Sequence, residues 1–271
     1  MLIAATVHFP YMTAWPERAS AAHRAAAADG FAQLGRAFAE ARVETIVALT
    51  SEHIVNLQPR MAAAFVVGVG DCHEAFPEPQ FKLAPLTRRG DPELAQELMR
   101  GLYARRFDPA HSSELRLDHG TTLPLAQMKI PESVAIVPVI VNSLFAPLPS
   151  LERCRALGEA IGSVLGASRL GRRVGLLATG GLSHTVGAPG MERNDPEFDA
   201  AFVRALVDGD LDRACSHADA TLDAIGNGTH EIRNWIAAAG AAQSRRARVV
   251  TAIPYAPGWD TGVHQLLWDE S

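Results

Sequence analysis

Short apolar runs alternate with longer stretches of helical character along this chain. The apolar runs are rich in valine, isoleucine and leucine and are seven or eight residues long, as expected of buried strands. Five such strands are predicted, at residues 2–9, 43–50, 63–69, 134–141 and 173–179. Helices are predicted at residues 18–42 and 149–165, and from Asp91-Pro92 onward, where a cap residue precedes a first-turn proline. The C-terminal third is expected to be mostly helical, with a last strand near 248–253.

Strands that alternate with helices favour a sheet covered on both faces. We therefore predict an α/β fold in which one domain, residues 1–271, has a central mixed β-sheet with helices on both sides. Pro138 falls inside the run at 134–141 and predicts an edge strand or a bulge there. The segment 77–89 contains three prolines and is interpreted as a surface loop, with a lid over a site as the alternative.

Composition narrows the class of protein. The 271 residues are 48% hydrophobic and 20% charged, which suits a large folded core. A net charge of −5 gives no electrostatic reason to expect nucleic acid as a partner. No apolar stretch is long enough for a membrane span, and no basic segment precedes the first apolar run as in a signal peptide. Three widely spaced cysteines suggest reduced thiols and a cytoplasmic location.

Four of the ten histidines follow predicted apolar runs. His8 ends the first strand, His53 follows the second, His119 follows the short run 115–117, and His184 follows the strand at 173–179. Ligands of open α/β sheets bind beyond the carboxyl ends of the strands, so these imidazoles are candidates for one site. A histidine at a strand end is also a common structural residue, and sequence separation leaves both interpretations open. The other histidines, except His230, are interpreted as surface or structural: His23, His73, His111, His217 and His264.

A carboxylate would complete a metal site. Two imidazoles and one carboxylate on one face, with open positions opposite, are typical of non-haem Fe(II). Glu231 is the candidate, because Thr229 is predicted to cap a helix and to place Glu231 in its first turn. The alternative is that Glu231 only stabilises the start of that helix.

Six segments in order resemble the class III extradiol ring-cleavage dioxygenases, a group that includes protocatechuate 4,5-dioxygenase. They are VHFP at 7–10, TSEHIVN at 50–56, LDHGTTLPL at 117–125, the stretch 137–162, ATGGLSH at 178–184, and GNGTHEIRNWIAA at 226–238. The resemblance implies Fe(II) held by His8, His53 and Glu231. It implies that His184 and His119 transfer protons during cleavage of a catechol-type ring with dioxygen. It also implies a homo-oligomer and, as in some relatives, a small partner subunit.

Several alternatives stay open. A Zn(II) hydrolase, or a metal-binding protein without dioxygenase activity, could use the same imidazoles. Within the dioxygenases, the substrate could be an aminophenol or a hydroxylated heterocycle. Thr121-Thr122 departs from the bulky residues of relatives and is expected to alter the pocket. Asn142 is assigned either a hydrogen bond behind the site or a turn, and Gly180-Gly181 either a close backbone approach or a plain turn.

Overall fold

One large sheet forms the centre of the molecule. A computed structural model describes residues 1–84, 86–191, 193–243 and 245–269. The eight strands of the sheet lie in the order β6-β3-β7-β2-β8-β1-β10-β9, and β4 and β5 form a separate pair. The bounds are β1 Leu2–Thr6, β2 Thr45–Thr50, β3 Phe65–Gly68, β4 Cys72–Glu74, β5 Thr87–Arg89, β6 Ala110–Ser112, β7 Ala135–Val141, β8 Val174–Thr179, β9 Arg248–Ala256 and β10 Thr261–Trp268.

The middle of the sheet is parallel and its flanks are antiparallel. β7, β2, β8 and β1 run in the same direction, whereas β3 is antiparallel to β7, and β10 is antiparallel to both β1 and β9. The carboxyl ends of β2, β8 and β1 therefore meet at one edge, which is where open α/β sheets bind ligands.

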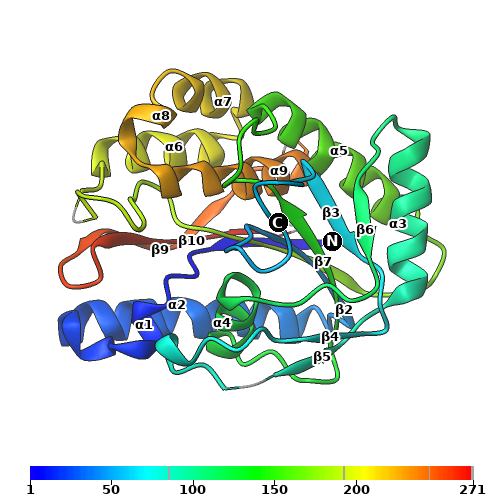
Figure 1. The fold of residues 1–271 in the computed structure, drawn as a ribbon, viewed down its shortest axis with the longest axis horizontal. Helices are drawn as coiled ribbons and strands as arrows, with labels where there is room; N and C mark the ends of the chain where they lie inside the picture. Colours follow the sequence, from blue (N-terminus) through cyan, green and yellow to red (C-terminus); the bar gives the residue numbers. More distant parts are fainter. Residues whose placement is uncertain (85, 192, 244, 270–271) are drawn as a thin grey trace.

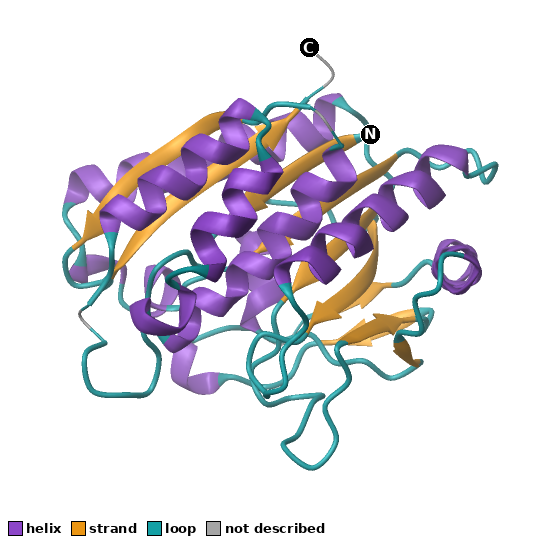
Figure 2. Cartoon of the chain, turned by 90° about the horizontal axis from the view of Figure 1, so that it is seen from above, coloured by secondary structure: helices purple, strands orange, loops and turns teal. Residues whose placement is uncertain are grey.

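Helices cover both faces of the sheet, as Figure 1 shows, and Figure 2 looks from above onto the helices of one face. In Figure 1, α5, α6, α7, α8 and α9 lie above the sheet, and α1, α2 and α4 lie below it. α3 stands at the right flank and packs in the same core as α5 and α9. The helix bounds are α1 Tyr11–Ala14, α2 Ala21–Glu40, α3 Pro92–Ala104, α4 His119–Gln127, α5 Leu151–Ala167, α6 Pro196–Asp208, α7 Leu211–Asp219, α8 Leu222–Ile225 and α9 Ile232–Ala242, with 3-10 turns η1 Pro16–Arg18, η2 Pro79–Phe81 and η3 Asn227–Glu231.

Alternate side chains of the central strands enter two separate cores. On β2, Val47 and Leu49 pack in the core under α3, α5 and α9, and Ile46 and Ala48 pack in the core over α2 and α4. All four side chains are fully buried. A strand buried on both faces carries a continuous apolar run, which is why these strands stood out in the sequence. The predicted α/β fold with a mixed sheet and helices on both faces is confirmed.

Three details of the strand prediction were wrong. Pro138 lies in an interior strand, since β7 sits between β3 and β2; the ladder to β3 covers only Val139 to Val141 and stops before the proline. The final strand at 248–253 is the first of a pair, and β10 was missed. The segment 77–89 forms η2 and β5, apart from Pro85, which lies outside the described residues.

The described helices include none with the length and apolar character that a membrane crossing requires.

Candidate metal centre

Three parallel strands deliver three histidines to one edge of the sheet. His8, His53 and His184 lie two to five residues beyond the ends of β1, β2 and β8. Glu231 comes from a separate segment, at the junction between η3 and α9. The structure therefore brings together residues that are up to 223 positions apart in the sequence.

The Glu231 carboxylate is the meeting point of these side chains. Its Oε1 lies 3.1 Å from Nε2 of His8 and 3.2 Å from Nε2 of His53. Its Oε2 accepts the backbone N–H of Gly181 at 2.6 Å and lies 3.8 Å from Nε2 of His184. Glu231 is 6% exposed, so water does not compensate its charge.

A chain of hydroxyls fixes the protonated nitrogen of His8. Nδ1 of His8 lies 3.3 Å from Oγ1 of Thr179, the Thr179 hydroxyl donates to Oγ1 of Thr50, and the Thr50 hydroxyl donates to the carbonyl of Ser51. A carbonyl can only accept, so the chain runs in one direction and Nδ1 of His8 must donate. Nε2 of His8 is then the ring atom that faces Glu231.

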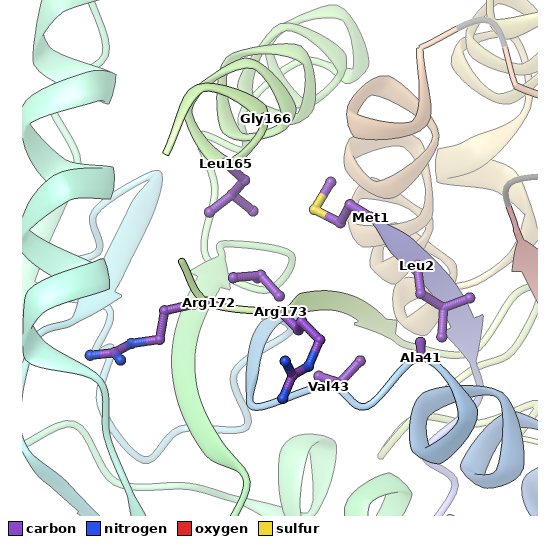
Figure 3. A pocket seen from close by; sticks show the side chains of 9 residues that line it. Met1, Leu2, Ala41, Val43, Leu165, Gly166, Arg172 and Arg173 are labelled. Carbon is purple, nitrogen blue, oxygen red and sulfur yellow. The ribbon is translucent and has the colours of Figure 1, made fainter. Parts of the chain in front are cut away.

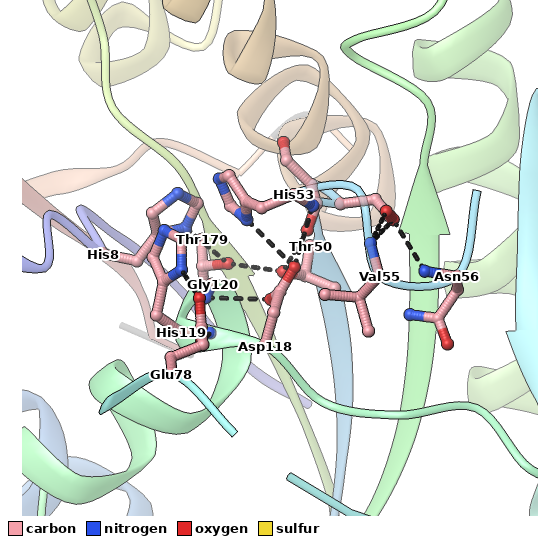
Figure 4. A network of polar contacts seen from close by, with 12 residues as sticks. His8, Thr50, His53, Val55, Asn56, Glu78, Asp118, His119, Gly120 and Thr179 are labelled. Carbon is pink, nitrogen blue, oxygen red and sulfur yellow. Dashed lines mark hydrogen bonds and ion pairs between the residues drawn. The ribbon is translucent and has the colours of Figure 1, made fainter. Parts of the chain in front are cut away.

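His53 and His119 are held in the same way by carboxylates (Figure 4). Nδ1 of His53 donates to Asp118 at 3.0 Å, and Nδ1 of His119 donates to Glu78 at 2.7 Å. Glu78 also accepts the backbone N–H of His119. These partners occupy each Nδ1, as carboxylates do behind metal-bound imidazoles, so Nε2 is the ring atom that a metal ion would bind.

His119 is a competing candidate for the third metal ligand. Its ring centroid lies 4.0 Å from that of His53 and 5.6 Å from that of His8. The three histidines each offer a nitrogen within 4.8 Å of the others, a spacing that suits a metal ion. The structure thus permits either Glu231 or His119 as the third ligand beside His8 and His53.

His184 lies beside this group with one nitrogen committed. Its Nδ1 donates to the Leu182 carbonyl at 2.9 Å, which leaves Nε2 as the reactive atom. Close backbone packing positions the ring: a Cβ on Gly181 or on Gly228 would collide with it. Gly180, at φ 153°, passes so near Glu231 that a side chain would lie 2.8 Å from its Cβ. The predicted close approach of Gly180-Gly181 is therefore present.

The electrostatics favour a cation between these groups. Burial would raise the pKa of Glu231, but the nearby His8 and His53 outweigh it and hold this pKa well below its usual range. Burial would lower the pKa of His53, but Asp118 and then Glu231 raise it well above its ordinary value. Burial lowers the pKa of His184 and of His119, so both are neutral at pH 7.

The site opens into a cavity of about 350 Å³. The five predicted residues line it together with Glu78, Gln80 and Phe81 from the segment 77–89, so the interpretation of that segment as a plain surface loop was wrong. The remaining lining side chains come from the start of α1 and from the loops after β1, β2, β7 and β8: Phe9, Pro10, Tyr11, Ile54, Leu144, Thr185, Val186 and Met191.

Three local assignments need correction. Thr229 caps no helix; it lies in η3, and its hydroxyl accepts the N–H of His184. His119 does not leave a strand but begins α4, where Asp118 accepts the N–H of Gly120. Thr121 and Thr122 are buried in α4 and do not line the cavity, so they cannot shape it directly.

The other residues considered in the sequence do not line the cavity. Asn142 forms a turn: its Oδ1 accepts the N–H groups of Leu144 and Phe145, and its amide donates to the Phe145 carbonyl. Among the histidines set aside, His73 and His264 are buried, and His111 is exposed. The sequence interpretation missed Asp118 and Glu78. Asp118 stands next to His119 in the quoted DHG motif, whereas Glu78 carries no local signal.

A larger cavity lies at the opposite edge of the sheet, where β1, β2 and β8 begin (Figure 3). It measures about 490 Å³ and includes Arg172 and Arg173 in its lining. Both guanidinium groups are paired, Arg172 with Asp91 and Glu93, and Arg173 with Glu44. Its described lining holds no histidine, cysteine or acidic side chain, so it lacks the candidate metal-binding groups of the histidine-lined edge.

Comparison with known proteins identifies the family of the chain. Residues 2–260 match a protein-family model described as the catalytic LigB subunit of aromatic ring-opening dioxygenase. The chain is 28% identical over 240 residues to a 2,3-dihydroxyphenylpropionate/2,3-dihydroxicinnamic acid 1,2-dioxygenase from Dechloromonas aromatica, covering 72% of this chain and 75% of that one. It is 36% identical over 121 residues to a gallate dioxygenase from Pseudomonas putida, covering 44% and 36%.

The extent of these matches varies. Among the first relatives, the matched stretch spans from 35% to 75% of the relative's own length. An uncharacterized protein from Escherichia coli K12 has a solved structure that superposes with a TM-score of 0.62 over 99% of this chain and 100% of that one. Its sequence identity is 15%, so the similarity concerns the fold alone.

Proposed function

Because the chain belongs to the family of catalytic LigB subunits of aromatic ring-opening dioxygenases, we propose that it is an Fe(II)-dependent extradiol dioxygenase. It would cut a catechol-type ring beside the two hydroxyls and incorporate both atoms of dioxygen. The enzyme class, an aromatic ring-opening dioxygenase, is that of the family. The metal, the cleavage position and the roles of the residues are the proposal.

One observation carries it: the Nε2 atoms of His8 and His53 both face Oε1 of Glu231. With Nδ1 of each ring donating elsewhere, the two Nε2 atoms and Oε1 of Glu231 are the atoms left to share a proton in the metal-free site or to hold a metal ion in its place. Two neutral imidazoles and one carboxylate are the donor set of non-haem Fe(II). When bound, Fe(II) supplies neighbouring positions for the catechol oxygens and dioxygen.

His184 is assigned the proton transfers. Its Nδ1 is occupied by the Leu182 carbonyl, so Nε2 is the atom that accepts a proton from a substrate hydroxyl and later returns it. Burial lowers the pKa of His184, which keeps the ring neutral and able to act as a base at pH 7.

His119 is assigned a second proton position on the other side of the cavity. The Glu78 carboxylate anchors its Nδ1 and its backbone N–H, which fixes the ring in one orientation. Its free Nε2 then faces the space beside His53, where it can hold a proton for the departing oxygen.

A second function is favoured by one specific observation. His8, His53 and His119 form a three-histidine group, and three histidines with an open position are typical of catalytic Zn(II). The alternative is therefore a Zn(II) hydrolase on the same fold. A dioxygenase that acts on an aminophenol or a hydroxylated heterocycle is the alternative within the proposed class.

Metal substitution tests the proposal. Metal-free protein is loaded anaerobically with Fe(II) or with Zn(II), then given catechol, 2-aminophenol or an aryl ester in air. The proposal predicts oxygen uptake and a yellow ring-opened product from catechol with Fe(II) alone. Oxygen uptake only with 2-aminophenol would change the assigned substrate from a catechol to an aminophenol. Ester hydrolysis with Zn(II), and no oxygen uptake with any substrate, would replace the proposed function with the hydrolase.

The assembly and the cellular location stay predictions. The family resemblance predicts a homo-oligomer, with a small partner subunit in some members, and light scattering of the purified chain measures this. A cytoplasmic location is in keeping with the three cysteines, all of which are free thiols.

A further inference from the structure

The walls of the site cavity differ in character between its floor and its mouth. Histidines and Glu231 form the floor. Four lining residues are also exposed to solvent and must therefore lie at the mouth: Ile54 at 67%, Leu144 at 42%, Val186 at 49%, and Gln80. Gln80 is polar, whereas the other three are aliphatic and come from three different loops. Exposed apolar side chains gathered at one opening mark a surface that meets an apolar group.

A polar side chain forms hydrogen bonds with the backbone at, or directly after, each of the three aliphatic residues. The Glu52 carboxylate accepts the N–H groups of Val55, Asn56 and Leu57, the residues that follow Ile54. The Asn142 side chain accepts the N–H of Leu144. The mouth is thus held in place at two positions by side chains that do not line the cavity.

At the third position, Val186, both backbone polar groups are hydrogen-bonded to one side chain. The Asn227 side chain bonds Val186 twice, accepting its N–H at 2.8 Å and donating to its carbonyl at 2.8 Å. Two hydrogen bonds to the backbone of one exposed valine hold this part of the loop in one conformation. The aliphatic mouth is therefore an ordered part of the cavity.

No positive side chain balances this apolar mouth. The described residues that line the cavity include neither lysine nor arginine, and they include the carboxylates of Glu78 and Glu231. Two cations next to lining residues have other contacts: the Arg18 guanidinium lies over the Tyr11 and Trp15 rings, and Lys82 donates to the Ala14 carbonyl. A carboxylate on the substrate would enter this cavity without a partner, which is costly.

We propose that this site takes a catechol with an uncharged, apolar substituent and discriminates against catechols that carry a carboxylate. The inference rests on the proposed function and names its substrate class. The catechol oxygens face the histidines, and the substituent lies against Ile54, Leu144 and Val186. A volume of about 350 Å³ exceeds the need of a bare dihydroxybenzene and leaves room for such a group. The relative from Dechloromonas aromatica is, by contrast, named for acids.

Matched pairs of ligands test the proposal by binding, independently of turnover. Fe(II)-loaded protein is titrated anaerobically in a calorimeter with 3-propylcatechol and 3-(2,3-dihydroxyphenyl)propionate, which differ only at the end of the side chain. 4-Methylcatechol and 3,4-dihydroxybenzoate make the same comparison at the other ring position. We expect the uncharged member of each pair to bind about tenfold more tightly or better, because the acid has no cation to pair with.

A charge introduced at the mouth should reverse this preference. Leu144→Arg is expected to raise the affinity for the propionate by about tenfold and to lower that for 3-propylcatechol. Val249→Arg is the matched control, since Val249 is similarly exposed at 44% but does not line the cavity. It should leave the preference as it is in the wild type.

The outcomes separate the two proposals. Equal or tighter binding of the acids by the wild type would overturn the substrate class, whether or not the ring is then cleaved. If air gives no oxygen uptake with any ligand, the dioxygenase function fails, while the titrations still decide which class of ligand the cavity accepts.

Discussion

Asp118 holds His53 at two points. Its Oδ2 accepts both the backbone N–H of His53, at 2.9 Å, and the Nδ1–H of its ring, at 3.0 Å. Its other oxygen accepts the N–H of Gly120 and so starts α4. Burial would raise the pKa of Asp118, but His53 outweighs it and holds this pKa at about 2. One buried carboxylate therefore couples the loop after β2 to the helix that carries His119.

Replacing this carboxylate should weaken metal binding. In Asp118→Asn the side chain can still accept one hydrogen bond from His53, but the negative charge beside the imidazole ring is lost. We therefore expect Fe(II) affinity to fall about 10- to 100-fold. Competition with a chelator measures it. Asp71→Asn, at an exposed aspartate, is the control. An unchanged affinity in Asp118→Asn would show that Asp118 serves the fold of α4 alone.

Substitutions at the site should separate iron binding from turnover. His8→Ala and Glu231→Ala are expected to lose iron, because each removes a donor from the converging set. His184→Ala should keep iron and lose about 100-fold or more of its turnover. Iron content and oxygen uptake are measured on each variant, with His111→Ala at an exposed histidine as the control. Full iron content in Glu231→Ala together with iron loss in His119→Ala would assign the third ligand to His119.

The buried parallel strands could be predicted from sequence because they are continuous apolar runs. β10 could not, since Thr261, His264 and Gln265 interrupt its pattern, although all three are buried. Gln265 is accommodated there by a hydrogen bond to Thr6, a contact with a strand 259 residues away. α4 was missed for a related reason: Gly120 and Pro124 argue against a helix, but Asp118 caps it and the cores bury it.

The site was predictable only where strand ends or family motifs marked it. Nothing in the sequence around Glu78 distinguishes it from a surface loop residue, because its role depends on where α4 places His119. Thr229 matched the pattern of a helix cap, but its hydroxyl instead meets the backbone of His184, which a tertiary contact alone determines.

Ile54 has an unfavourable backbone conformation, with φ at 65°. A β-branched residue in the left-handed region is strained, and glycine is not. Ile54→Gly should therefore raise stability by roughly 0.5–1 kcal/mol, the relieved strain being partly offset by the greater freedom of glycine in the unfolded chain. It should also raise the KM for an alkylcatechol, because the mouth loses an apolar wall.

Ile54→Ala is the matched control for this variant. It removes the same apolar wall but keeps Cβ, so KM should rise without the gain in stability. Urea denaturation and steady-state oxygen uptake measure the two effects. A less stable Ile54→Gly protein would contradict the account of strain at the mouth.

Asp199 should make stability fall as the pH rises. Burial raises its pKa to about 7, with a further contribution from Asp195, and the N–H of Ser183 stabilises the charged form only in part. The unfolded chain has an ordinary aspartate pKa near ~4. The folded protein therefore binds more protons between about pH 4 and pH 7, and the stability present below this window is lost across it.

Asp199→Asn removes that titration. The variant should be more stable than the wild type at pH 8, by a few kcal/mol at most, and its stability should depend less on pH between 5 and 8. Urea denaturation at both pH values measures the difference, with Asp219→Asn at an exposed aspartate as the control. A wild type that gains stability over this range relative to Asp199→Asn would contradict the raised pKa.

Isotope labelling tests the central claim most directly. Fe(II)-loaded protein turns over 3-propylcatechol under ¹⁸O-labelled dioxygen, and mass spectrometry of the ring-opened product follows the label. The account predicts that both atoms of one dioxygen molecule enter the product. A product that takes its oxygen from water alone, or no ring-opened product with a fully iron-loaded site, would contradict it.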